Sequence, residues 1–164
     1  MLRTALPDDA AAVSQLLKRS YERLMAGSYT ERELAAFLPL ITQAQPELLA
    51  SGTYYVVEIS GSLVGAGGWT RTTPGSGTIS RATAHIRHVA VDPDHLRLGI
   101  GRRLLNHSID QAVAQGVRLI MCFSSLNAVE FYESFGFKPL ESIEIDMGAS
   151  CSMSAIKMEL PIQP

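Results

Sequence analysis

One stretch of the chain, residues 84–123, restricts the fold more than any other, because its order of patterns admits few arrangements. Ala84–Val91 has the composition of a strand, and after a loop with two glycines Gly99–Gln115 carries apolar residues at helical spacing. The run at Val117–Phe123 is apolar nearly throughout, as in a strand that is covered on both faces. Strand, helix and strand form a βαβ unit with parallel strands and a right-handed crossover. The sequence therefore predicts an α/β protein, a mixed sheet with helices on both faces.

The remaining segments supply shorter elements on either side of this unit. The first helix is expected to begin at Asp8 or Asp9, and the second at a capping box of Thr30 and Glu33. Prolines then break the second helical region into pieces. In chain order we expect a strand at Leu2–Leu6, a helix ending at Gly27, a helical region broken at Pro39 and Pro46, a hairpin of Tyr54–Ile59 and Leu63–Thr70, an exposed loop at Thr72–Thr83, a short helix between Asn127 and Gly136, and strands near Lys138–Ile145 and Ser152–Leu160.

Length and composition narrow the class of protein. A chain of 164 residues, 46% of them hydrophobic, buries a core of its own and is expected to form one domain over residues 1–164. A formal net charge of −2 predicts neither a nucleic-acid partner nor an anionic membrane surface. Two cysteines are too few for a disulfide framework or a zinc cluster, so no metal is expected, and Cys122 is expected to be a buried, inert thiol.

The beginning of the chain also bears on where the protein works. It has no apolar run of the kind found in secretory signals and carries Asp8 and Asp9 early. No stretch approaches the roughly 18 apolar residues of a membrane span. We therefore expect a cytoplasmic protein, and the sequence leaves a homodimer open.

The junction between the first strand of the βαβ unit and its helix carries most of the chemistry. Gly99 and Gly101 stand where the helix begins, and the first helical N–H groups have no partner inside the helix. With the helix dipole, these groups make a site suited to a phosphate or pyrophosphate, although two glycines also occur in a merely tight turn. Leu104 occupies the third glycine position of a dinucleotide-binding motif, and a Walker loop and a nucleophile elbow are both absent.

Three segments in this order resemble the GNAT superfamily of acyl-CoA-dependent N-acetyltransferases. They are the strand AHIRHVAVDP, the loop HLRLGIGRRLL and, some thirty residues later, NAVEFYESFGFKPL. The order of the predicted elements over the whole chain is similar as well. The family loop is usually written Q/R-x-x-G-x-G/A, and here Leu96 stands where Gln or Arg is usual. The resemblance implies a largely antiparallel sheet of about six to seven strands, with the central parallel pair splayed to admit acyl-CoA.

The resemblance implies acetyl-CoA as co-substrate and a particular set of residues around it. The main chain of the strand that precedes the loop would hydrogen-bond the pantetheine arm like an added strand. Backbone N–H groups of the loop would hold the phosphates, and Arg97 or Arg102 would supply the charge that Leu96 lacks. Asn127 would contact the arm of the cofactor, although it also suits a helix N-cap. The predicted cofactor residues are Val89, Ala90, Val91, Arg97, Leu98, Gly99, Ile100, Gly101, Arg102, Asn127 and Tyr132.

Transfer to an amine requires a proton acceptor for the amine and a proton donor for the departing thiolate. Tyr132 resembles the general acid of the family, although it also suits packing of the last helix on the sheet. His85 stands where several members carry a glutamate, and its ordinary pKa of about 6.5 suits a base. His88 would face the opposite side in a regular strand, and a bulge there would bring both histidines to one cleft. Water and backbone groups remain the alternative to either histidine.

The acceptor is expected between the first two helices and the loop at Thr72–Thr83. Its nature, a small-molecule or peptide amine, is not specified by the residues predicted to line the site, which are neither strongly acidic nor clearly basic. These residues are Tyr21, Met25, Tyr29, Trp69 and Arg71. Tyr21 also fits the apolar stripe of its helix, and Trp69 also suits packing against the loop.

Two functions from different classes are therefore open. The first is an acetyl-CoA-dependent N-acetyltransferase that uses direct attack by the amine, without an acyl-enzyme. The second is an acyl-CoA-binding sensor on the same fold that has no catalytic activity. Tyr132 and His85 favour the enzyme. A third function, nucleotide binding at the Gly99–Gly101 loop, would show ATP or NAD binding instead.

Overall fold

The computed structural model describes residues 1–148 and 150–163, which form one seven-stranded sheet in the order β1-β2-β3-β4-β5-β7-β6. Only β4 and β5 pair in parallel, and every other neighbouring pair is antiparallel. The α/β class and the largely antiparallel sheet predicted from the sequence are confirmed. The strands are β1 (Leu2–Thr4), β2 (Tyr54–Ile59), β3 (Ser62–Thr70), β4 (Thr83–Val91), β5 (Leu119–Ser125), β6 (Lys138–Gly148) and β7 (Cys151–Pro161).

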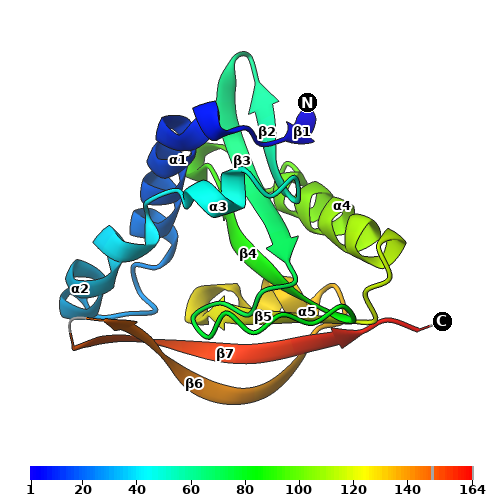
Figure 1. Cartoon of the computed structure of the whole chain (residues 1–164). Helices are drawn as coiled ribbons and strands as arrows, with labels where there is room; N and C mark the ends of the chain where they lie inside the picture. The colour runs from blue at the N-terminus through cyan, green and yellow to red at the C-terminus, as the bar shows by residue number, and fades with distance from the viewer. Residues whose placement is uncertain (149, 164) are drawn as a thin grey trace.

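Helices cover the sheet on both faces, as Figure 1 shows for α1 and α4. Apolar side chains of α1 and α3 pack with those of β2 and β3 on one face, whereas α4 and α5 pack on the other. A third cluster joins α2 to β7 around the fully buried Phe37. The α-helices are α1 (Ala10–Leu24), α2 (Glu31–Ile41), α3 (Pro46–Leu49), α4 (Ile100–Ala114) and α5 (Val129–Glu133), and short 3₁₀ turns form η1 (Pro7–Asp9), η2 (Pro93–His95) and η3 (Leu126–Ala128). In the described part of the chain no helix has the length and apolarity to cross a membrane.

The α2 helix shows one prediction confirmed and one that is wrong. Its N-terminus is the predicted capping box, in which the Thr30 side chain accepts from the Glu33 N–H and Glu33 accepts from the Thr30 N–H. The expected break at Pro39 does not occur, and the helix continues to Ile41 with Pro39 inside it. A proline inside a helix costs about 3 kcal/mol. Burial of the apolar side of α2, centred on Phe37, offsets this loss.

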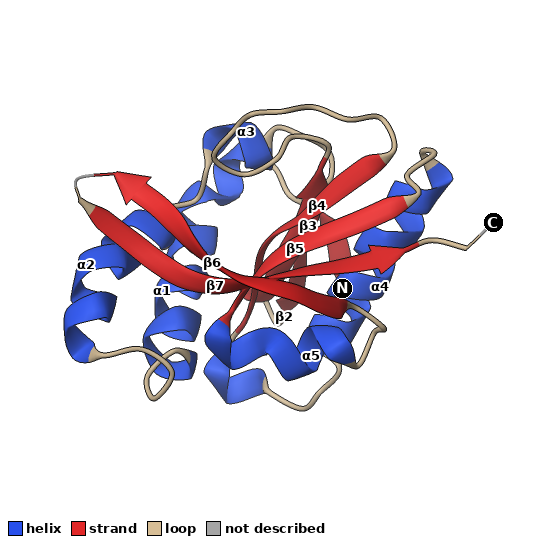
Figure 2. Ribbon diagram, turned by 90° about the horizontal axis from the view of Figure 1, so that it is seen from below, coloured by secondary structure: helices blue, strands red, loops and turns tan. Residues whose placement is uncertain are grey.

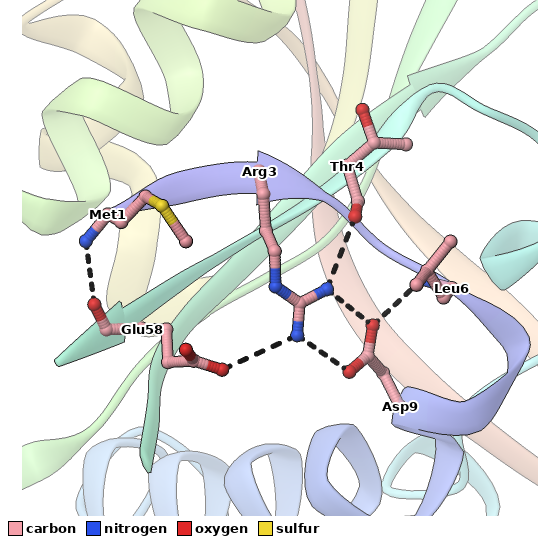
Figure 3. A network of polar contacts seen from close by, with 6 residues as sticks. All are labelled: Met1, Arg3, Thr4, Leu6, Asp9 and Glu58. Atoms are coloured by element: carbon pink, nitrogen blue, oxygen red, sulfur yellow. Dashed lines mark hydrogen bonds and ion pairs between the residues drawn. The ribbon is translucent and has the colours of Figure 1, made fainter. Parts of the chain in front are cut away.

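The N-terminal corner is held by charged groups (Figure 3). The Arg3 guanidinium on β1 forms two 2.9 Å hydrogen bonds with the Asp9 carboxylate of η1 and lies 3.5 Å from Glu58 of β2. This contact holds the pKa of Asp9 below its usual range. Asp9 occupies the N-cap position of α1 but does not cap the helix, because its carboxylate also accepts from the Leu6 N–H. The structure therefore confirms Asp9 at the N-cap position, but the predicted hydrogen bond from the helix to its side chain is wrong.

Candidate active site

The parallel strands β4 and β5 separate part-way along their length. They pair only at three positions, from Thr83↔Leu119 to His85↔Met121. Beyond this point residues 86–91 of β4 pair with β3 alone, and residues 122–125 of β5 pair with β7 alone. Figure 1 shows the consequence, since β2–β4 run steeply while β6 and β7 run across them. The predicted splay is present, with its vertex at His85.

A β-bulge lies in β4 beside this opening. Between the pairs Ala66↔Ala90 and Gly68↔Arg87, the single residue Gly67 of β3 lies opposite two residues of β4, His88 and Val89. His88 absorbs the extra residue with φ of 44°, a left-handed conformation, and its carbonyl accepts a 2.7 Å hydrogen bond from the Tyr54 hydroxyl. The sequence-based expectation that a bulge would bring both histidines to one face is met in this backbone.

The open edge of β4 presents backbone groups to the gap. The Asp92 N–H donates to the Val64 carbonyl of β3, and alternation along the strand then directs the N–H and carbonyl groups of Val89 and Val91 away from β3. Among the described residues, the Tyr21 hydroxyl of α1 donates a 3.3 Å hydrogen bond to one of these groups, the Val89 carbonyl. Val89 and Val91 therefore offer an unpaired strand edge of the kind that an extended ligand binds.

The N-terminus of α4 follows the open edge. Gly99 is the N-cap residue with φ of 77°, and an added Cβ there would meet nothing within 4 Å, so backbone conformation alone requires the glycine. At Gly101 a Cβ would lie 3.2 Å from the Phe131 ring, so a side chain there would require that ring to shift by a few tenths of an ångström. Ile100 is buried, whereas Arg97 and Leu98 are exposed beside the helix end. Arg102 is also exposed and lies 4.6 Å over the Phe135 ring of the segment after α5.

Tyr132 of α5 lies on the α4 face of the sheet, near the splay. Its ring packs edge-on against Phe131 and Phe137, in the core cluster that also contains Cys122. Burial raises the pKa of Tyr132 well above its ordinary value of 10.0, so the hydroxyl stays protonated at neutral pH. Cys122 is buried, and burial raises the pKa of its thiol to about 12. The predicted burial of Cys122 is confirmed, and the raised pKa agrees with an unreactive thiol.

His85 lies on the opposite face, at the vertex of the splay. It is 6% exposed, its ring stands edge-on to Phe123, and its Nε2 lies 3.1 Å from the Thr73 hydroxyl. Its Nδ1 is buried without a hydrogen-bond partner among the described residues. Burial, with the Arg87 and Lys157 cations, lowers the pKa of His85 below 6.5, so the ring is neutral at neutral pH. If Nε2 donates its hydrogen to Thr73, Nδ1 keeps a lone pair that is able to accept a proton.

His88 faces the same side as His85 but is bound differently. Its Nε2 lies 3.2 Å from the Gln45 side-chain nitrogen, and its ring lines a small cavity under α1 and α3. Burial, followed by the nearby Arg87 cation, lowers the pKa of His88 to about 4. Of the two predicted base candidates, His88 has the pKa that is lowered to about 4 and is therefore the weaker base.

A pocket of about 620 Å³ opens on this face beside His85 and His88. Figure 2 shows its two walls, α3 and the loop between β3 and β4, at the same edge of the molecule. Thr73 and Gln45 line it, and they are the residues whose side chains lie beside the His85 and His88 rings. The loop that was predicted to border the acceptor lines this pocket, whereas the helical residues that line it belong to α3 and not to α1 or α2.

The predicted acceptor residues are not gathered around this pocket. Met25 and Tyr29 belong to the core between α2 and β7, where the Tyr29 hydroxyl donates to the Ser154 carbonyl and accepts from the Leu126 N–H. Trp69 is in the core beneath α4, although part of it lines the pocket wall. Arg71 lines the pocket as well, but its guanidinium bonds the Gln115 carbonyl at the end of α4. Tyr21 alone reaches the open edge of β4.

Asn127 does not take the N-cap position that its residue type favours. The helix α5 begins at Val129, its N-cap position is Ala128, and no side chain of the described residues caps it. Asn127 itself lies in η3 and is exposed. Its side chain is therefore available at the end of β5, on the side of the opening where contact with a cofactor was expected.

Two residues of this region were missed by the sequence analysis. Arg87 lines the pocket and bonds Gln45, and Gln45 in turn lies beside His88. Arg87 alternates with His85 along a predicted strand, so the period of two placed both on one face. No sequence signal marked Gln45, which is brought here by the turn before α3.

Comparison of the chain with models of protein families identifies the family to which it belongs. The model of the acetyltransferase (GNAT) family matches residues 11–137, which include both strands of the opening and the helix between them. The chain belongs to the GNAT family of acetyltransferases. The family resemblance found in the sequence is confirmed.

Relatives of this GNAT chain match it over shorter stretches. Ribosomal protein bS18-alanine N-acetyltransferase of Escherichia coli K12 is 42% identical over 57 residues, which are 33% of this chain and 38% of that protein. An uncharacterized N-acetyltransferase of Methanocaldococcus jannaschii is 34% identical over 67 residues, 39% of this chain and 30% of that protein. The match thus spans well under half of either relative.

Solved structures share the GNAT fold over nearly the whole chain. A GCN5-related N-acetyltransferase from Rhodopseudomonas palustris has a TM-score of 0.79 at 21% identity, over 99% of this chain and 95% of that one. The PaiA N-acetyltransferase from Thermoplasma acidophilum, solved in complex with coenzyme A, has a TM-score of 0.73 at 17% identity, over 98% of both chains.

Proposed function

We propose that this GNAT chain is an N-acetyltransferase that carries an acetyl group from acetyl-CoA to a primary amine by direct attack of the amine. The observation that carries the proposal is the opening between β4 and β5. Its vertex has a histidine on one face, beside a pocket, and the opening is bordered on the other face by a buried tyrosine. One face would hold the acceptor and the other the leaving thiol.

The cofactor would lie along the open edge of β4 and end at α4. Acetyl-CoA supplies the thioester, and its pantetheine amides match the unpaired N–H and carbonyl groups of Val89 and Val91. The Tyr21 hydroxyl now bound to the Val89 carbonyl would give way to the cofactor. The α4 N-terminus behind Gly99 supplies N–H groups and partial positive charge for the phosphates. Arg97 and Arg102 stand beside it and supply full charges.

Tyr132 would hold the departing sulfur by a hydrogen bond. A CoA thiol with a pKa of about 8.5 is a stronger acid than an ordinary phenol with a pKa of about 10. Burial raises the pKa of Tyr132 further, so complete transfer of its proton to the thiolate is uphill. The same burial strengthens a hydrogen bond to a developing charge, because no water competes for it. We therefore assign Tyr132 as a hydrogen-bond donor to the sulfur.

His85 would take the proton of the amine, directly or through one water. An alkyl ammonium with a pKa of about 10.4 is mostly protonated at neutral pH, so the amine must lose a proton before it attacks. A neutral His85 ring suits that step better than His88, whose pKa burial lowers to about 4. Cys122 takes no covalent part, because a thiol with a pKa of about 12 supplies almost no thiolate.

The name of the Escherichia coli relative specifies its acceptor more closely than this proposal specifies the acceptor of this chain. The Escherichia coli relative is named for an alanine of ribosomal protein bS18, which makes a peptide amine one acceptor class for this chain. The pocket volume of about 620 Å³ suits a small-molecule amine equally well.

The test begins with binding and continues with turnover. Calorimetric titration of the purified chain with acetyl-CoA, with NAD and ATP as controls, is expected to give selective binding in the micromolar range. Release of CoA thiol is then followed across a panel of peptide and small-molecule amines. Binding together with amine-dependent release supports the enzyme. Tight binding with no release from any acceptor would instead identify a non-catalytic acyl-CoA sensor, and failure of a folded sample to bind acetyl-CoA would refute both.

A further inference from the structure

Arg87 and Glu47 both line the pocket beside His85, but among the described residues Arg87 forms no ion pair with a carboxylate. The Arg87 guanidinium is half-buried, and it donates from Nη2 to the Gln45 side-chain oxygen at 2.9 Å and from Nη1 to the Thr70 hydroxyl at 3.2 Å. Burying a guanidinium without an anion is unfavourable. Burial accordingly lowers the pKa of Arg87, but the side chain keeps its charge.

The other arginine that lines this pocket already has partners for its guanidinium. Arg71 lines the same wall, but its Nη2 donates to the Gln115 carbonyl at 2.6 Å and its guanidinium lies 5.4 Å from the Trp69 ring centre. Arg71 therefore caps the C-terminal end of α4, where a cation is favourable. Arg87 has five N–H donors, and the bonds to Gln45 and Thr70 use only part of them. The remaining donors suit a carboxylate, which a guanidinium binds through two parallel hydrogen bonds.

The distance between Arg87 and His85 limits the size of the ligand. The two residues are separated by one residue in β4, so their backbones lie about 7 Å apart and their side chains leave the same face of the sheet. Thr70 and Gln45 hold the guanidinium in place, and Thr73 holds the His85 ring. A molecule whose amine lies next to His85 and whose carboxylate reaches Arg87 has only a few bonds between these two groups.

We propose that Arg87 binds the carboxylate of the acceptor, so that the acceptor is a free amino acid whose amine is acetylated next to His85. This inference rests on the proposed transferase function and narrows its substrate class. The amine of a peptide N-terminus has no carboxylate beside it, and such an acceptor would leave Arg87 unpaired. The pocket of about 620 Å³ accommodates an amino acid with its side chain directed to the loop at residues 72–77.

The experiment compares each acceptor with its uncharged counterpart. Thiol release is measured for the standard α-amino acids and for their α-amides, which keep the amine and stand in for a peptide N-terminus. We expect kcat/KM for the preferred amino acid to exceed that for its amide at least tenfold. In Arg87→Met this kcat/KM is expected to fall roughly 10- to 100-fold, the range for a lost charged hydrogen bond. The kcat/KM for the amide is expected to change much less, through the effect of the Arg87 charge on the pKa of His85, and the affinity for acetyl-CoA to stay unchanged.

Two further variants test whether the preference for a carboxylate depends on Arg87 itself. Arg71→Met removes the same charge from the same wall and is expected to retain the preference for the carboxylate. Arg87→Lys keeps the charge without the paired donors, is the safer variant if Arg87→Met does not fold, and is expected to recover part of the preference. Thermal melting confirms that each variant is folded.

The possible outcomes separate this inference from the proposed function. Turnover of amides or peptides as fast as amino acids overturns the role of Arg87 and leaves the transferase intact. If no acceptor releases thiol, the transferase fails, and calorimetric titration of the same amino acids into the CoA-bound protein decides on Arg87. Binding that Arg87→Met abolishes supports the carboxylate site, and the absence of binding to the wild type refutes it.

Discussion

His88 combines an unfavourable backbone conformation with an unfavourable place for a charge. Its φ of 44° accommodates the extra residue of the bulge, and its ring is held against Gln45 under α3. Burial, with the Arg87 cation, lowers the pKa of the folded ring to about 4, whereas an unfolded histidine titrates near 6.5. The neutral ring therefore stabilises the fold above pH 6.5, and this contribution is lost as the pH falls toward 4.

We expect a pH-dependent difference between the wild type and His88→Asn, a residue that tolerates the left-handed conformation. From a folded pKa of about 4, the linkage corresponds to about 3 kcal/mol of unfolding free energy lost by the wild type between pH 7 and pH 4. His88→Asn carries no titrating ring and should lose less over the same interval. Urea unfolding at both pH values measures the difference, and parallel losses in the two proteins would show that His88 is protonated without penalty.

Tyr132 and Tyr29 are two buried tyrosines with different expected roles. Tyr132→Phe removes the donor proposed for the leaving sulfur and is expected to lower kcat roughly 100-fold with little change in acetyl-CoA affinity. Tyr29→Phe removes two structural hydrogen bonds, to Ser154 and from Leu126, and is expected to cost about 1–3 kcal/mol of stability without lowering kcat. Kinetics and chemical unfolding of both variants test the assignment. Unchanged kcat in Tyr132→Phe would remove this tyrosine from the mechanism.

At the residue scale, sequence spacing predicted those features that depend on the local backbone. The bulge agrees with the separation of the two histidines in one strand, and the helix start at Gly99 agrees with the glycine pattern of the loop. The pocket role of Arg87 did not follow, because an arginine in a strand usually points to solvent. Arg87 is held in the pocket by Gln45, which lies more than forty residues earlier in the sequence. Only folding brings the Gln45 Oε1 within 2.9 Å of the Arg87 Nη2.

At the scale of elements, the turn into α4 contains two glycines. Gly99 has a left-handed backbone conformation, and Gly101 lies close to the Phe131 ring. Gly99→Ala places a side chain at φ of 77° and is expected to cost about 1–2 kcal/mol of stability and to weaken acetyl-CoA binding, since the first turn shifts. Gly99→Asn should retain most of both, because asparagine tolerates this conformation and an added Cβ meets nothing within 4 Å. Unfolding and calorimetric titration test the pair. Equal losses in the two variants would mean that space for the ligand, and not the backbone, requires Gly99.

Elements were predicted well where a local signal and tertiary packing agree. The Thr30–Glu33 capping box and the hairpin of β2 and β3 are such cases. Pro39 is the opposite case, because its local effect breaks helices, yet α2 runs through it. The packing of Phe37 with Tyr29 and Met153 offsets the effect of Pro39, and Met153 lies far from α2 in the sequence. A helix-breaking residue thus predicts an interruption only where the helix has no buried side to hold it.

At the scale of the whole molecule, the opening divides the sheet into two parts. The β1–β4 part and the β5–β7 part share only the three paired positions of β4 and β5, together with contacts through helices and clusters on both faces. A ligand that bonds the open edge of β4 fills the gap between the parts. Acetyl-CoA at 100 times its Kd is therefore expected to stabilise the fold by about 2.7 kcal/mol, and its effect on the backbone should be confined to one side of β4.

Hydrogen exchange resolves that side residue by residue. The Ala90 N–H faces β3, whereas the N–H groups of Val89 and Val91 face the gap, so without ligand we expect Val89 and Val91 to exchange faster than Ala90. Acetyl-CoA should slow exchange at Val89 and Val91 much more than at Ala90, and NAD should change none of the three. Amide exchange measured by NMR in both states gives this alternation directly. Equal protection along residues 89–91 would indicate general stiffening of β4, and the ligand would then have to bind away from the open edge.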